Sequence, residues 1–113
     1  MSRAPTLKTS RQFSRVYKSG RSASDGFFVL RSAARGDGGG SVLGLSVSRK
    51  VGKAVSRNKI RRRIFEIWRE ALRRGELKPG FDAVFIARRG AAGADYSNTL
   101  RSVTRLMKRR GLL

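Results

Sequence analysis

Residues 60–72 read IRRRIFEIWREAL, and this stretch decides the fold because it carries the longest regular pattern in the chain. Its apolar residues recur with the period of about 3.6 residues that is typical of an α-helix with one buried stripe. The stripe consists of Ile60, Ile64, Ile67, Trp68, Ala71 and Leu72. Polar residues fall on the opposite side, namely Asn58, Arg62, Arg69 and Arg73. The pattern predicts a long helix that begins within residues 51–56 and ends near Gly75.

A shorter helix and two strands are predicted before this long helix. Thr9 and Gln12 have the spacing of a capping box, so a short helix is expected to run from here to Gly20. Its apolar side consists of Phe13, Val16 and Tyr17. Residues 27–33 (FFVLRSA) and 42–48 (VLGLSVS) are rich in β-branched and aromatic residues, which favours strands.

Glycines and prolines mark the turns of the chain. The sequence GDGGG at residues 36–40 separates the two strands and predicts a flexible hairpin loop. Residues 47–51 are compatible with a further short strand. After the long helix, Pro79 and Gly80 predict a turn, and residues 82–88 (DAVFIAR) predict another strand. A last helix, closed by a glycine, has an inner side that consists of Leu100, Val103, Leu106 and Met107.

This order of elements predicts an α+β fold in one domain. Helices and strands follow one another as α, β, β, α, β, α, with the additional strand as an option, so helices are expected to pack on one sheet. The length of 113 residues fits a single domain. We expect residues 1–8 to form a basic, flexible arm and residues 9–113 to form the domain.

The net charge is the strongest indication of function. The chain has 27 Lys and Arg residues against 7 Asp and Glu residues, a formal charge of +20. No acidic residue lies between Asp37 and Glu66, whereas basic residues are dense there. A polyanion relieves the self-repulsion of such a domain, which favours nucleic-acid binding over a merely solvated surface or an anionic membrane.

The sequence contains few of the residue types and patterns from which catalytic or metal sites are built. It contains no His and no Cys, and its carboxylates are scattered over Asp25, Asp37, Glu66, Glu70, Glu76, Asp82 and Asp95. Neither a phosphate-binding loop of Walker type nor a dinucleotide-binding motif occurs. We therefore expect no catalytic side chain, no metal site and no cofactor bound by the protein itself. No apolar run long enough for a membrane helix is present, and a cytoplasmic location is the default expectation.

Residues 45–68 read LSVSRKVGKAVSRNKIRRRIFEIW, and this segment resembles the signature of the bacterial ribonuclease P protein subunit. The signature joins a Ser-rich strand end, two basic residues, a G-x-A-V turn and an Arg-Asn-Arg helix. The T-x-x-x-F-x-x-V-Y/F-x-x-G pattern of the first helix and the IAR at the end of the last strand also match. The chain departs from this signature in two ways. Lys59 replaces the second arginine of the triplet. Phe65 stands where the family commonly has a basic residue, and Arg63 stands where it has an apolar one.

The resemblance implies a subunit that helps a catalytic RNA to remove the 5′ leader of precursor tRNA endonucleolytically. The RNA would hold the Mg²⁺ ions and carry out the chemistry, so the protein would be part of an enzyme without being catalytic alone. The implied fold is a four-stranded sheet with helices on one side and a left-handed β-α-β crossover. A ribosomal protein of similar fold is the alternative, and a DNA-binding protein is disfavoured because no helix-turn-helix or wedge hairpin is evident.

The resemblance also implies two sets of RNA-binding residues. The set expected to bind the catalytic RNA consists of Arg49, Lys50, Lys53, Arg57, Asn58, Lys59, Arg61 and Arg62. The set expected to bind the single-stranded leader consists of Phe13, Tyr17, Phe28, Arg31, Arg88 and Arg89. For Phe13 and Tyr17, the spacing on an amphipathic helix favours core packing equally well. Stacking under the bases of a leader is the alternative for both.

Overall fold

The structure, a computed structural model, describes residues 6–113. Two 3-10 turns, η1 (Arg49–Val51) and η2 (Arg89–Gly93), precede the two later helices. The remaining elements are α1 (Ser10–Ser19), β1 (Arg21–Ser24), β2 (Phe28–Ala34), β3 (Val42–Ser46), α2 (Ala54–Arg73), β4 (Phe81–Ala87) and α3 (Tyr96–Arg109). The α+β class and the three predicted helices are confirmed, and the capping box of α1 is present between Thr9 and Gln12.

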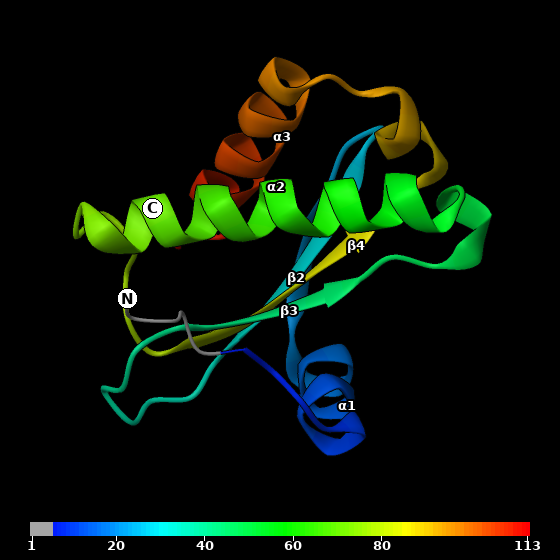
Figure 1. Cartoon of the computed structure of the whole chain (residues 1–113). Coiled ribbons are helices and arrows are strands. Elements are labelled where there is room, and N and C mark those ends of the chain that lie inside the picture. Colours follow the sequence, from blue (N-terminus) through cyan, green and yellow to red (C-terminus); the bar gives the residue numbers. More distant parts are fainter. Residues whose placement is uncertain (1–5) are drawn as a thin grey trace.

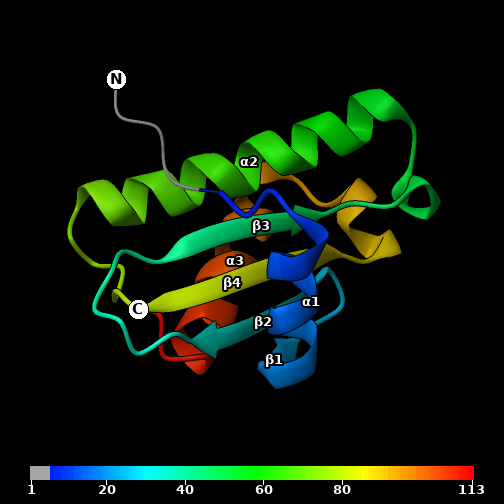
Figure 2. The same cartoon turned by 90° about the horizontal axis from the view of Figure 1, so that it is seen from below.

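The strands form one sheet in the order β1-β2-β4-β3. Strand β4 is antiparallel to β2 and parallel to β3, so β3, α2 and β4 form a β-α-β unit. In Figure 2, β3 and β4 both run toward the right, β3 lies above β4, and α2 lies behind the sheet. This arrangement is the left-handed crossover that the family resemblance implies, although right-handed crossovers are the rule.

Helices cover both faces of the sheet, which corrects the expectation that they lie on one side. Helices α2 and α3 lie above the sheet in Figure 1, and α1 lies below it. The main core lies on the α2 and α3 side, where Phe28, Leu30 and Phe85 meet Ile64 and Trp68. All five of these side chains are fully buried. Strand β4 is buried on both of its faces, because the sheet is the middle layer between α1 on one side and α2 and α3 on the other.

A smaller cluster fixes α1 against the opposite face of the sheet. Val16 of α1 and Val84 of β4 are fully buried there, together with Leu7. The ring of Phe13 lies against the backbone of Gly44 in β3. The packing of α1 on the sheet therefore depends on a small apolar cluster and on the absence of a β-carbon at Gly44, which leaves room for the Phe13 ring.

Two predictions about the strands are wrong. The additional strand is β1 and not a segment near residues 47–51, where the chain turns through η1 because the parallel strand β3 must leave the sheet to enter α2. The segment RSAS of β1 has no β-branched or aromatic residue, so its sequence gives no strand signal. The strands on either side of residues 36–40 form no hairpin, because β4 pairs with both and lies between them.

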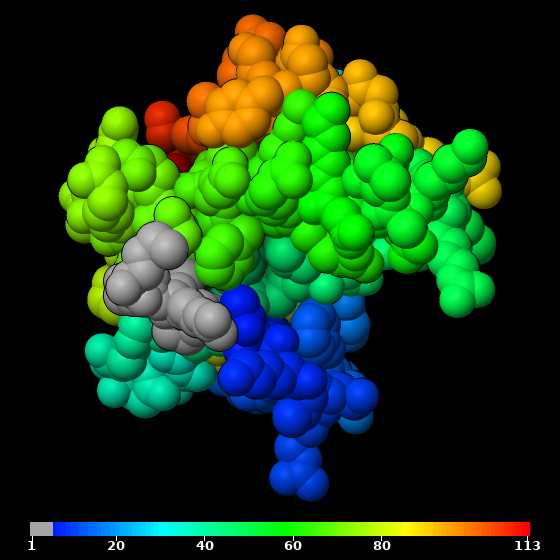
Figure 3. All heavy atoms as spheres, in the orientation of Figure 1, coloured from blue at the N-terminus to red at the C-terminus, as the bar shows by residue number. Residues whose placement is uncertain are grey.

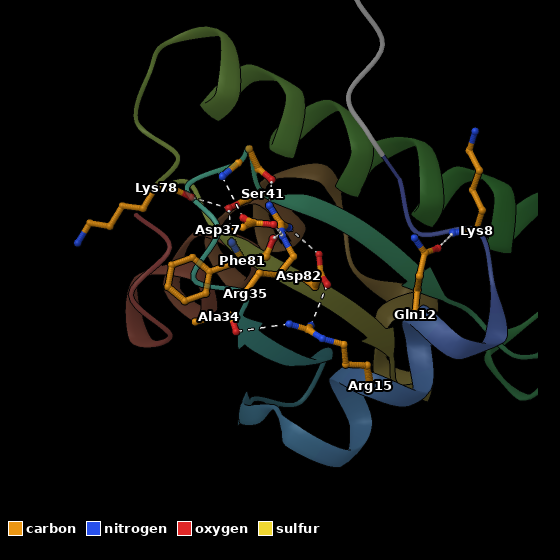
Figure 4. Close-up of polar contacts among 12 residues, drawn as sticks. Lys8, Gln12, Arg15, Ala34, Arg35, Asp37, Ser41, Lys78, Phe81 and Asp82 are labelled. Atoms are coloured by element: carbon orange, nitrogen blue, oxygen red, sulfur yellow. Dashed lines mark hydrogen bonds and ion pairs between the residues drawn. The ribbon is translucent and has the colours of Figure 1, made fainter.

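The glycine loop is held by Arg35 and Asp82 (Figure 4). The Arg35 guanidinium donates to the Asp82 carboxylate at 2.7 Å and to the Gly40 carbonyl, and it pairs with Asp37. Asp82 also accepts from Arg15 of α1 at 3.0 Å. One buried carboxylate thus ties the loop, the sheet and α1 together.

The first described residues lie along the sheet. The Leu7 N–H donates to the Leu43 carbonyl at 2.8 Å, and Thr6 forms a parallel bridge with Leu43. These residues belong to the segment that was expected to be a flexible arm, whose residues 1–5 lie outside the described residues.

Candidate nucleic-acid interface

The N-terminal half of α2 presents an outward stripe of polar and basic residues. Val55, Asn58, Lys59 and Arg62 follow one another at the helical spacing i, i+3, i+4, i+7, and all four are exposed. Val55 is 80% exposed, so an apolar side chain lies at the N-terminal end of this stripe. Sequence reasoning missed Val55, although counting back from Lys59 by one helical turn would have placed it on the outer side.

Arg57 and Arg61 of the predicted RNA-binding set are half-buried beside this stripe. Arg61 donates to Asn58 Oδ1 at 2.9 Å and to the Val47 carbonyl, so it fixes β3 to α2. The Nε atom of Arg57 is buried without a hydrogen-bond partner. The Arg61 guanidinium is therefore partly structural and Arg57 is partly buried, so the exposed cations Lys59 and Arg62 are more accessible to a polyanion.

Basic residues from both predicted sets meet at one end of the sheet. The turns η1 and η2 contact each other there. Arg49 and Lys50 in η1, and Arg88 and Arg89 at the start of η2, are all exposed. With Lys53 at the start of α2, also exposed, they form one basic end of the molecule. The two sets that sequence reasoning separated are thus neighbours in space.

Few carboxylates are available to neutralise these cations. Five of the seven carboxylates make hydrogen bonds or ion pairs inside the protein, and these are Asp25, Asp37, Glu70, Asp82 and Asp95. Among residues 6–113, the cations in ion pairs are Arg15, Arg35, Arg73 and Arg74. In the described part of the chain, the cations of the basic end and of the outward stripe of α2 are therefore not neutralised by ion pairs within the protein.

The sheet face beside α1 forms a second accessible surface. Val29, Ile86 and Ser46 are cross-strand neighbours on β2, β4 and β3, and all three are half-buried. The rings of Phe13 and Tyr17 lie 6.4 Å apart and are tilted by 42°, and Tyr17 is 40% exposed. Aromatic rings next to an accessible apolar strip, with cations at the strand end, form a surface on which single-stranded bases can stack.

Two members of the predicted leader-binding set have other surroundings. Phe28 is fully buried and packs edge-to-face on Phe85, so the assignment of Phe28 to an RNA surface is wrong. Its side chain points into the main core because the alternation of strand β2 turns Phe28 and Leu30 to that side. The Arg31 guanidinium donates to the carbonyls of Tyr17 and Gly20 at 2.8 and 2.9 Å, and so it caps the end of α1.

Residues 6–113 contain neither a candidate metal cluster nor a candidate membrane helix. No group of three or more His, Cys, Asp or Glu side chains is arranged to hold a metal ion in that part of the chain. None of its helices combines the length and the apolar character that crossing a membrane requires.

The fold and its basic surfaces define a compact α+β RNA-binding protein, and comparison with known proteins identifies the family. A family model described as Ribonuclease P matches residues 1–111. The Ribonuclease P protein component of Clostridioides difficile (strain 630) is 38% identical over 107 residues, which cover 95% of this chain and 92% of that protein. The component from Clostridium kluyveri is 40% identical over 112 residues, with 94% of each chain covered.

Solved structures agree with the sequence comparison. The structure of the Staphylococcus aureus RNase P protein has a TM-score of 0.87 at 30% identity, covering 97% of this chain and 98% of that one. The RNase P protein from Thermotoga maritima has a TM-score of 0.81 at 33% identity, covering 92% and 96%. The chain belongs to the family of ribonuclease P protein components. It is a subunit of an endoribonuclease that processes the 5′ end of tRNA, and its partner is ribonuclease P RNA, so the ribosomal alternative does not hold.

Proposed function

We propose that the chain contacts ribonuclease P RNA with the N-terminal half of α2 and the basic end, and holds the 5′ leader of precursor tRNA on the sheet face beside α1. The protein neutralises phosphates and positions the leader. Mg²⁺ ions held by the RNA supply the chemistry, with no step on a protein side chain. DNA and membranes are not partners in this proposal, and the site of action is the cytoplasm, where precursor tRNA is transcribed.

The distribution of charge along α2 is the observation that supports the RNA contact. The first half of the helix contains no carboxylate, whereas Glu66 and Glu70 lie in the second half. The N-terminus of a helix also carries a partial positive charge that favours phosphate. Lys59 and Arg62 are exposed and have no ion-pair partner among residues 6–113.

The surface chemistry beside α1 supports the leader contact. A folded RNA presents phosphates, whereas a single strand presents the faces of unstacked bases. Phe13 and Tyr17 offer rings beside the half-buried strip of Val29 and Ile86, and Arg88 continues this surface at the end of β4. Arg31 contributes by holding the end of α1 and with it the backbone of Tyr17.

A charge-removal experiment tests the RNA contact. We expect Lys59→Ala with Arg62→Ala to weaken assembly with ribonuclease P RNA and to reduce the salt dependence of assembly by about one unit of slope per lost phosphate contact. The matched control is Arg69→Ala, which removes an exposed cation from the second half of the same helix. If both variants reduce affinity equally per charge, attraction is diffuse and the assigned surface is wrong.

A second experiment tests the leader contact. We expect Tyr17→Ala to weaken binding of precursor tRNA by the holoenzyme by roughly 5- to 150-fold, since stacking on one base contributes ~1–3 kcal/mol. Binding of mature tRNA should not change, and Tyr17→Phe should retain most of the affinity. Tyr96→Ala is the control, because Tyr96 is 45% exposed but lies on α3. Equal losses for precursor and mature tRNA, or none for a folded Tyr17→Ala protein, would contradict the proposal.

A further inference from the structure

A groove between the second half of α2 and α3 lies on the side of the sheet opposite to α1. It has a volume of about 720 Å³ and is lined by both helices, whose green and orange side chains meet along the upper front of the molecule in Figure 3. Its apolar lining residues are Ile67, Ala71, Leu100, Met107 and Leu113. Leu100 was predicted to lie on the inner side of the last helix, but it is 40% exposed because it faces this groove.

The two walls of the groove differ in charge. Helix α3 contributes Arg101, Arg105 and Lys108, which lie on one helical line at i, i+4 and i+7 and are exposed. The α2 side contributes Glu70 and, just beyond the helix, Arg74 and Glu76, and Arg74 is ion-paired with Glu70 at 2.9 Å. Hydrogen bonds and charge from Arg73, and further from Arg74, lower the pKa of Glu70 to about 2, so this carboxylate is ionised at neutral pH.

This distribution sets the groove apart from the RNA-facing surfaces. The chain has only three glutamates, Glu66, Glu70 and Glu76, and all of them lie on or just after the second half of α2. On the α2 side Arg74 offsets one of the two carboxylates, so this wall favours phosphate less than the α3 wall does, and the apolar floor offers bases no hydrogen bonds. A second copy of this chain is also a poor occupant, because each copy carries a net charge of +20.

We propose that the α2–α3 groove docks an acidic amphipathic helix of a partner protein. The apolar stripe of such a helix covers the floor around Leu100, and its carboxylates lie along the cations of α3. Helices commonly bind in grooves of this kind through apolar residues at i, i+3, i+4 and i+7. Charge complementarity with Arg101 and Arg105 fixes which flank of the helix lies toward α3. The surface is independent of the RNA contacts, because it uses the other half of α2.

A designed peptide tests this proposal on the full chain, both free and assembled with ribonuclease P RNA. The probe is a fluorescent peptide of about four helical turns with leucines at i, i+3, i+4 and i+7 and glutamates on one flank. One control peptide has the same composition in scrambled order, and a second has lysines in place of the glutamates. Fluorescence anisotropy reports binding, and the emission of Trp68, the single tryptophan, reports that each variant is folded.

We expect saturable binding of the glutamate peptide to both forms of the protein and at least about tenfold weaker binding after Leu100→Asp. Arg101→Glu with Arg105→Glu should reverse the preference, so that the lysine peptide binds better than the glutamate peptide. Arg11→Glu with Lys18→Glu makes the same charge change at exposed positions of α1, outside the groove and outside the residues assigned to RNA, and should change affinity by less than about threefold.

Four outcomes would overturn the proposal. Equal binding of the scrambled peptide, or equal losses for the two double reversals, would mean diffuse charge attraction. Loss of peptide binding on assembly with ribonuclease P RNA would mean that the RNA covers the groove. Displacement of the peptide by a single-stranded RNA oligonucleotide, with the same dependence on Leu100, would make the groove a nucleic-acid site.

Discussion

The ring of Phe13 lies so close to Gly44 that a β-carbon at residue 44 would come within 2.9 Å of the ring atom Cε1. The same β-carbon would also approach Leu7 at 2.9 Å. Any side chain at residue 44 must therefore displace the Phe13 ring, which packs α1 on the sheet, and the end of the Leu7 side chain. Because α1 carries Tyr17, this contact relates the packing of the sheet to the proposed leader surface.

We predict that Gly44→Ala displaces α1 and destabilises the protein by about 1–3 kcal/mol, the usual cost of inserting a methyl group into a packed contact. Binding of precursor tRNA by the holoenzyme should weaken, whereas assembly with the RNA should be nearly unchanged. Gly40→Ala is the control, since a β-carbon there meets no atom within 4 Å. Chemical denaturation and precursor binding measure the two effects, and an unchanged leader affinity in a destabilised Gly44→Ala protein would separate Phe13 packing from leader binding.

Asp82 should matter more for stability than either arginine that it binds. Its side chain is 9% exposed and accepts from Arg15 and Arg35, whose side chains are 41% and 18% exposed. We predict that Asp82→Ala lowers the free energy of unfolding by about 3 kcal/mol, because it removes the buried carboxylate partner of the Arg35 guanidinium and leaves only the exposed Asp37. Arg15→Ala should cost less than about 1 kcal/mol, since its cation remains largely in water. Urea denaturation of the two variants would refute this ranking if the losses were equal.

Asp25 should contribute stability that depends on pH. Burial by itself raises its pKa, but hydrogen bonds from the Ser102 hydroxyl and from the Phe28 and Phe27 N–H groups hold the pKa below the ordinary value of 3.8. The folded state therefore favours the carboxylate, so the stabilisation is complete above about pH 4 and is lost as pH falls through the folded-state pKa.

The difference in unfolding free energy between the wild-type protein and Asp25→Asn should therefore be constant near neutral pH and shrink below about pH 4. Ser102→Ala should remove part of the same difference, because the hydroxyl is one of the donors to Asp25. Denaturation curves at several pH values measure the difference in unfolding free energy for each variant. A difference that grew toward acid would have the wrong sign for a lowered pKa.

Folding of the free protein should depend on multivalent anions. A formal charge of +20 on a chain of 113 residues opposes compaction, and anions that bind the folded state relieve this repulsion. We predict that circular dichroism in low-salt buffer shows partial unfolding, and that sulfate restores a cooperative melt at lower ionic strength than chloride does. Identical cooperative melts in all three buffers would contradict this prediction.

The local sequence patterns predicted the helices, whereas they did not predict the order of the strands in the sheet. The apolar period of α2 predicted a buried stripe from Ile60 to Leu72, and it is confirmed as far as Ala71 because one face of that helix contacts the sheet. Leu72, at the end of the predicted stripe, is 38% exposed, so this part of the prediction is wrong. The insertion of β4 between β2 and β3 depends on contacts distant in sequence, and no local signal reports it. Phe28 was misplaced because an alternating strand does not reveal which face is covered, and the capping role of Arg31 depends on where α1 docks.

We expect this chain to enable ribonuclease P RNA to process precursor tRNA. The most direct measurement is the rate of leader release from a precursor tRNA by ribonuclease P RNA at a Mg²⁺ concentration too low for the RNA alone, with and without the purified protein. We predict that the protein restores cleavage at the mature 5′ end, that Lys59→Ala with Arg62→Ala requires more protein to do so, and that the protein without RNA cleaves nothing. Leader release that stays unchanged over a range of protein concentrations, or cleavage by RNA-free protein, would contradict the account.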